Sequence, residues 1–143
     1  MTYSQGAREL ARGYGPASLV RAGAAWGLIA EEMTSVADDY DAVVAPLKAS
    51  LARNGADGTA LRLELFGRWL RELSLRAGAT AHRAESASVA HSVAVLQVPL
   101  GTASETEADD RAAAAIMREY QQACRVATRP WRTPQPPGGP GRK

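Results

Sequence analysis

A long heptad pattern of apolar residues dominates the first half of this chain. Apolar side chains recur in alternating steps of four and three residues, at Ala22, Trp26, Ile29, Met33, Val36, Tyr40, Val43 and Leu47. An α-helix brings residues at this spacing onto one face. The pattern therefore predicts one long helix over about residues 17–51, with an apolar heptad seam that another helix must cover.

The segment 54–58, Asn-Gly-Ala-Asp-Gly, is the clearest turn in the sequence. A second long helix is expected over about residues 59–97, and a short turn requires it to return antiparallel beside the first. Its seam consists of Phe66, Leu70, Leu73, Ala77, Ala81, Ala84, Ala87, His91 and Val95. The second half of this seam is rich in small residues, which predicts a close approach by a neighbouring helix.

Residues 98–101, Val-Pro-Leu-Gly, end the second helix. Thr102 and Ser104 are each followed three residues later by a glutamate, which is the spacing of a capping box at a helix start. A third helix of about 24 residues, roughly 36 Å long, is expected to follow and to stop before Pro130.

Pro46 is an anomaly inside the first helix. Proline lacks the N–H that would bond the carbonyl four residues earlier, and its ring crowds that carbonyl. Two outcomes remain open: a kink near residues 42–45, or an end to the helix followed by a short second helix.

The domain organisation predicted from these patterns has three parts. Residues 1–16 form an N-terminal turn segment, residues 17–127 form a helical bundle domain, and residues 128–143 form a disordered tail rich in proline, glycine and arginine. The fold class is all-α, with an elongated antiparallel helical hairpin and a third helix.

Composition excludes several classes of function. The net charge is only +2 and no block of basic residues occurs, which argues against nucleic-acid binding. Cys124 is the only cysteine, so neither an intramolecular disulfide nor a thiol-rich metal site is expected. No run approaches the roughly 20 apolar residues of a membrane span, and Glu9 interrupts the N-terminus where a signal peptide would need an apolar core.

The sequence offers no constellation of catalytic or metal-binding residues. His82 and His91 are nine residues apart and fall on different helix faces, so both are interpreted as structural. Asp38, Asp39 and Asp41 are interpreted as a solvated acidic face. We therefore expect a non-enzymatic protein without metal or cofactor.

The two long helices carry more apolar surface than the third helix can cover. Another helical hairpin, from a different protein or from a second copy of this chain, is the expected remedy. The residues predicted to bind it are Trp26, Ile29, Met33, Val36, Tyr40, Val43, Leu47, Phe66, Trp69, Leu70 and Leu73.

Several segments resemble the N-terminal domain of the actinobacterial PPE family. Residues 15–20, Gly-Pro-Ala-Ser-Leu-Val, and 24–33, Ala-Ala-Trp-Gly-Leu-Ile-Ala-Glu-Glu-Met, are similar to the opening of that domain. Trp69-Leu70 and the stretch 112–120 resemble later parts of it. The Pro-Pro-Glu signature is absent, and about one helix of the family pattern is missing between Val98 and Thr102.

The resemblance implies a PPE-like helical bundle that pairs with a small PE-type helical hairpin. Such a pair is exported by a type VII secretion system, so the chain would be cytoplasmic before export and then secreted or held in the cell envelope. Leu100 and Gly101 would be a remnant of the tip that docks a secretion chaperone. The alternative is a cytosolic adaptor or regulator that forms its own homodimer.

Overall fold

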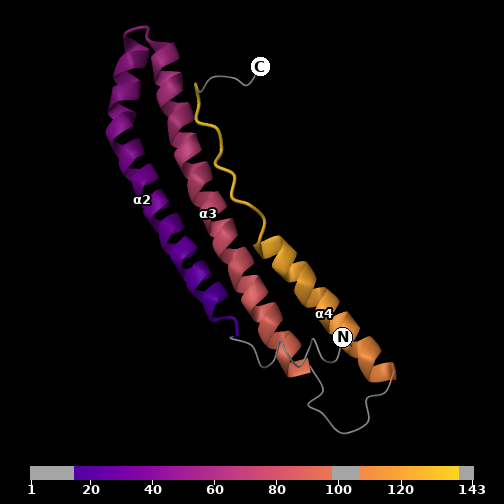
Figure 1. Cartoon of the computed structure of the whole chain (residues 1–143). Helices are drawn as coiled ribbons and strands as arrows, with labels where there is room; N and C mark the ends of the chain where they lie inside the picture. The colour runs from indigo at the N-terminus through magenta and orange to yellow at the C-terminus, as the bar shows by residue number, and fades with distance from the viewer. Residues whose placement is uncertain (1–14, 98–106, 139–143) are drawn as a thin grey trace. The chain divides into compact units, whose positions relative to one another are not determined.

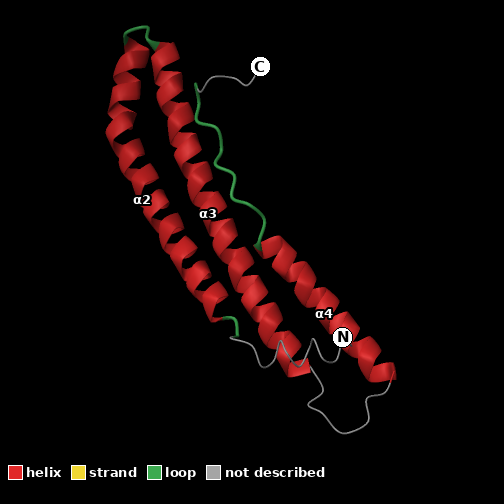
Figure 2. Ribbon diagram, in the orientation of Figure 1, coloured by secondary structure: helices red, strands yellow, loops and turns green. Residues whose placement is uncertain are grey.

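The computed structural model describes residues 15–97 and 107–138 of the 143-residue chain. These residues form three helices, α2 (Ala17–Arg53), α3 (Asp57–Gln97) and α4 (Glu107–Ala127). All regular structure in the described residues is helical (Figure 2). The all-α prediction is therefore confirmed, and the first two helices lie within two residues of their expected bounds.

Pro46 does not interrupt α2. The helix is continuous from Ala17 to Arg53 with the proline inside it. Of the two outcomes left open by the sequence, a break followed by a separate short helix is wrong. The helix continues without the one backbone hydrogen bond that an amide N–H at residue 46 would donate.

The turn between α2 and α3 follows from its glycine. Gly55 has a positive φ of 75°, a conformation that side chains with a Cβ rarely adopt. The amide of Ala56 donates to the carbonyl of Leu51 at 2.8 Å, and the amide of Gly55 donates to that of Ala52 at 3.2 Å. This pair of bonds is a Schellman cap, which ends α2 at Arg53 and allows α3 to begin at Asp57, two residues after Gly55.

The described residues divide into two compact units. Unit 1 contains residues 15–25, 80–97 and 107–130, and unit 2 contains residues 26–79 and 131–138. Each long helix therefore contributes one part to each unit.

Unit 1 is built on small residues. Within it, α4 runs antiparallel beside the last part of α3 (Figure 1). A Cβ on Gly23 of α2 would lie 3.2 Å from Cγ of Glu85 and 3.5 Å from the carbonyl oxygen of Ala81. The close approach that the alanine-rich sequence predicted is thus confirmed. The buried residues of this unit are Gly23, Ala81, Ala84, Ala87, His91, Ala94, Ala113 and Ala114.

Unit 2 is an antiparallel hairpin of α2 and α3 (Figure 1). Its buried apolar residues are Ala37, Val44, Leu70 and Ala77. The predicted seam of α2 is therefore wrong by one residue at alternate positions, because Ala37 and Val44 face α3 in place of Val36 and Val43. Both sets are apolar and recur every seven residues, so the periodicity alone does not distinguish them.

Some expectations fall outside the described residues. These are the capping-box residues Thr102 and Ser104, the tip residues Leu100 and Gly101, and most of the N-terminal turn segment. The tail expected to be disordered is described up to Gly138, and its residue Pro134 is buried within unit 2.

Candidate partner-binding face

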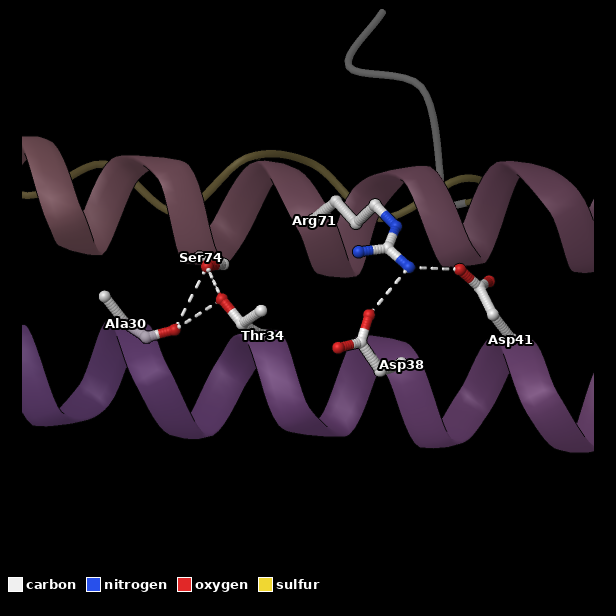
Figure 3. A network of polar contacts seen from close by, with 6 residues as sticks. All are labelled: Ala30, Thr34, Asp38, Asp41, Arg71 and Ser74. Atoms are coloured by element: carbon white, nitrogen blue, oxygen red, sulfur yellow. Dashed lines mark hydrogen bonds and ion pairs between the residues drawn. The ribbon is translucent and has the colours of Figure 1, made fainter.

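The hairpin of unit 2 has one polar face, on which ion pairs and hydrogen bonds join the two helices (Figure 3). Arg71 of α3 reaches Asp38 at 3.0 Å and also pairs with Asp41, both on α2. These two hydrogen bonds raise the pKa of the Arg71 guanidinium, so the cation is stabilised where it stands.

A second polar contact lies further along the same face. The hydroxyls of Thr34 and Ser74 are 2.6 Å apart. Both hydroxyls also lie within hydrogen-bond distance of the carbonyl oxygen of Ala30, at 2.9 Å for Thr34 and 3.0 Å for Ser74, so two protons are shared among three contacts. The hydroxyl of Ser74 therefore links α3 to the backbone of α2. The polar side chains of this face that are named here have their partners on the other helix of the hairpin.

An aromatic cluster marks the other face of unit 2. Phe66 lies between Tyr40 and Trp69, with ring centroids 5.2 Å apart in each pair. The Tyr40 hydroxyl donates to the carbonyl oxygen of Leu63 at 2.7 Å. Burial, with the negative charge of Asp41, raises the pKa of Tyr40, which therefore stays neutral at physiological pH.

An uncovered apolar stripe on α2 lies beside this cluster. The exposed fractions are 41% for Ile29, 47% for Val36, 73% for Val43 and 48% for Leu47. Residues of one sheltered seam would show values near those of Ala37 at 0% and Val44 at 6%. The stripe is thus apolar, regular in spacing and left exposed by the residues that the structure describes, which is the pattern of a helix-packing surface.

The eleven residues predicted to bind a partner all lie in unit 2. Leu70 is buried between the helices of the hairpin itself. The half-buried members are Trp26, Met33, Tyr40, Trp69 and Leu73. The exposed members are Ile29, Val36, Val43, Leu47 and Phe66. The structure therefore brings most of the set to one face, with Leu70 beneath it.

The C-terminal tail lies against this hairpin, which the sequence did not predict. The indole of Trp131 stacks on that of Trp26, with ring centroids 4.9 Å apart and an interplanar angle of 26°. Nε1 of Trp69 donates to the carbonyl oxygen of Pro134 at 2.9 Å. Residues 131–138 have no helical periodicity, so only the isolated tryptophan hinted at a contact.

Unit 1 has a groove of its own between α3 and α4, with a volume of about 330 Å³. Val89 and Val93 of α3 line one side, and Ile116 and Tyr120 of α4 line the other. Tyr120 also meets the buried His91 edge-on, with ring centroids 5.6 Å apart. Burial, together with a hydrogen bond to Cys124, raises the pKa of Tyr120 to about 12. The sequence did not anticipate this groove, because it depends on where α4 docks.

The described residues contain no cluster of three or more histidine, cysteine or acidic side chains placed to hold a metal ion. None of the helices α2, α3 and α4 is long and apolar enough to cross a membrane.

Comparison with known families decides the relationship that the sequence suggested. Residues 6–119 match the model of the PPE family. The chain belongs to the PPE family. Its helical fold agrees with that of the family, and the match covers most of the resemblance described above. No curated protein and no solved structure matches the chain in the corresponding searches.

Proposed function

We propose that this PPE protein is one half of a heterodimeric helical assembly, and that the apolar face of unit 2 binds a small PE-type helical hairpin. The observation that carries the proposal is the exposed stripe of Ile29, Val36, Val43 and Leu47. Four large aliphatic side chains on a near-heptad spacing would bury against a second pair of helices and complete a four-helix arrangement. PPE proteins pair with PE proteins, and the stripe is where such a pairing would be made here.

The chemistry of the face favours a helix over other partners. Full burial of an exposed aliphatic side chain contributes about 1.5–3 kcal/mol, and each residue of the stripe, 41–73% exposed, would contribute a corresponding share of that. The polar contacts of Arg71 and Ser74 lie on the other face, so the apolar face offers mainly aliphatic and aromatic side chains. A partner must therefore match it by shape and apolarity, which an amphipathic hairpin does.

We further propose that the pair, once formed, is exported by a type VII secretion system, and that the chain has no catalytic role. Family membership supports both statements, since PPE proteins are non-enzymatic helical proteins linked to secretion. Epitope-tagged chain should appear in the culture filtrate or envelope fraction of an actinobacterial host with an intact type VII system. Equal amounts outside a host that lacks the secretion ATPase would contradict this route.

Co-expression with PE-type hairpins, followed by size-exclusion chromatography with light scattering, tests the pairing. The expected result is a stable 1:1 complex. Val36→Asp places a charge in the centre of the stripe and should abolish the complex. Ser35→Asp is the matched control, because Ser35 is the exposed neighbour outside the stripe and carries the same new charge.

Two results would overturn the heterodimer. A homodimer of the chain alone that Val36→Asp dissociates would assign the stripe to a second copy. A soluble monomer that melts cooperatively and binds no hairpin would remove the need for a partner altogether.

A further inference from the structure

The tail of unit 2 makes three specific contacts with the hairpin. Trp131 stacks on Trp26 of α2. The carbonyl oxygen of Pro134 accepts from Trp69, and that of Arg132 accepts from Nη1 of Arg76 at 3.0 Å. The tail thus touches both helices, and α3 provides two side-chain donors to its backbone.

These donors lie on one stripe of α3. Residues 69 and 76 are seven apart, which places them on the same side of a helix, two turns from one another. The backbone carbonyls that they bind belong to Pro134 and Arg132, two residues apart in an extended segment. Pro134 itself is buried. Seven residues of helix rise about 10.5 Å, whereas two residues of extended chain span about 7 Å. The side chains of Trp69 and Arg76 therefore close the difference to reach the two carbonyls.

The tail lies on the apolar face of the hairpin. Trp69 belongs to the aromatic cluster with Phe66 and Tyr40, whereas Arg71, which pairs with Asp38, is two residues further and so lies about 200° around the same helix. On α2, Trp26 stands one turn before Ile29, the first residue of the exposed stripe. The tail therefore covers one edge of the same face whose aliphatic stripe is uncovered.

We propose that Trp26, Trp69 and Arg76 form a binding groove for an extended, proline-containing segment, and that the chain's own tail fills it and caps part of the partner-binding face. Aromatic side chains that hold an extended proline segment, with an indole N–H on its carbonyl, are a recurring mode of peptide recognition. The tail must leave when a helical partner covers the whole face, a step that rests on the proposed function.

The docking of the tail is tested without any partner. Two stacked indoles give paired exciton bands in far-ultraviolet circular dichroism, and the full chain should show them. Trp131→Phe should remove the bands. Gln135→Ala, in the same segment but exposed, should leave them unchanged. Absence of the bands from the unmodified chain, or their persistence in Trp131→Phe, would overturn the docking.

A labelled peptide of residues 129–138 tests the groove as a binding site. Fluorescence anisotropy should show that it binds full-length Trp131→Ala at least fivefold more tightly than the unmodified chain, in which the tail competes. A peptide with alanine at the tryptophan should not bind. Equal binding to both chains, or to neither, would overturn the assignment of the groove.

The capping role is tested with a PE-type hairpin that forms a complex. Trp131→Ala should bind the hairpin severalfold more tightly than the unmodified chain does. In this variant the hairpin no longer has to displace a docked tail from the partner-binding face. Unchanged or weaker binding would overturn the capping role. If neither chain binds any hairpin, the proposed function fails, and the capping role fails with it. The exciton bands and the peptide binding still test whether the tail docks in the groove.

Discussion

The two units of this protein use the same two helices in opposite ways. In unit 1 the helices carry alanine and glycine at their contacts, and α4 packs beside α3. In unit 2 the buried residues include Val44 and Leu70, while the stripe of Ile29, Val36, Val43 and Leu47 remains exposed and the tail lies along one edge of its face. Small residues permit the close contact seen in unit 1, whereas a row of exposed aliphatic residues is a surface that further helices can cover.

The largest expected effect separates the buried row of unit 2 from its exposed stripe. Ala37 has no exposed surface, so Ala37→Asp should bury an unpaired charge and cost more than about 4 kcal/mol of the free energy of unfolding. Val36→Asp, one residue earlier, should change the stability of the isolated chain by less than about 0.5 kcal/mol. Urea unfolding of both variants measures the difference. Similar losses in both would show that the two rows are not distinct.

The next effect probes the close packing of unit 1. Ala87 has no exposed surface, and Ala87→Leu should lower the free energy of unfolding by about 1–3 kcal/mol through overpacking. Val89→Leu is the control, because Val89 is 62% exposed on the same helix. Thermal and urea unfolding compare them. An Ala87→Leu chain as stable as its control would contradict the close approach.

A pair of glycines tests the same idea in unit 2. A Cβ on Gly67 would lie 3.0 Å from Oδ1 of Asp41 and 3.2 Å from Cε1 of Tyr40, both held by their own bonds. Gly67→Ala should therefore cost about 1 kcal/mol. Gly27→Ala meets no atom within 4 Å and should add about 1 kcal/mol through helix propensity. Equal stabilisation of both would show that the helices of unit 2 are less closely packed at Gly67 than described.

The last effect appears only in alkali and concerns the α3–α4 contact. The pKa of Tyr120 is about 12 in the folded chain, whereas the ordinary pKa of tyrosine, expected in the unfolded chain, is 10.0. Between pH 10 and 12 the unfolded chain therefore loses this proton first, and the free energy of unfolding falls as the pH rises. Tyr120→Phe should make that fall shallower in urea unfolding across this window. An unchanged slope would mean that Tyr120 titrates alike in both states.

The helices themselves were predictable because their cause is local. Apolar periodicity located α2 and α3, and Asn54-Gly55 located the turn between them. The predicted seam of α3 was also correct at its buried residues, whereas Leu73 is half-buried and Phe66 is exposed. The buried members are Leu70, Ala77, Ala81, Ala84, Ala87 and His91. The family resemblance of residues 15–33 was confirmed by the family match.

The register of α2 was not predictable, since two adjacent rows are apolar. Ile29 and Val36 are stronger hydrophobes than Ala30 and Ala37, and a sequence pattern favours them for the buried row. The structure places Ala30, Ala37 and Val44 toward α3. At the first two positions the smaller residue lies inside, where it lets the helices approach, whereas Val43 and Val44 are identical and neither hydrophobicity nor size separates them.

The tail illustrates the same limit. Trp131 and Pro134 belong to a segment without periodicity, and their contacts with Trp26 and Trp69 join distant parts of the chain. Such contacts depend on the shape of a surface that two packed helices create, so a local sequence pattern does not predict them.

By itself the sequence determined where helices form, where they turn and to which family the chain belongs, because periodicity, glycine conformation and motif spacing are properties of neighbouring residues. Only the tertiary structure decided which apolar row is buried, which stripe is left for a partner, and that the tail lies on that face. Those outcomes depend on side-chain volume and on contacts between residues far apart in the chain, which the one-dimensional pattern does not contain.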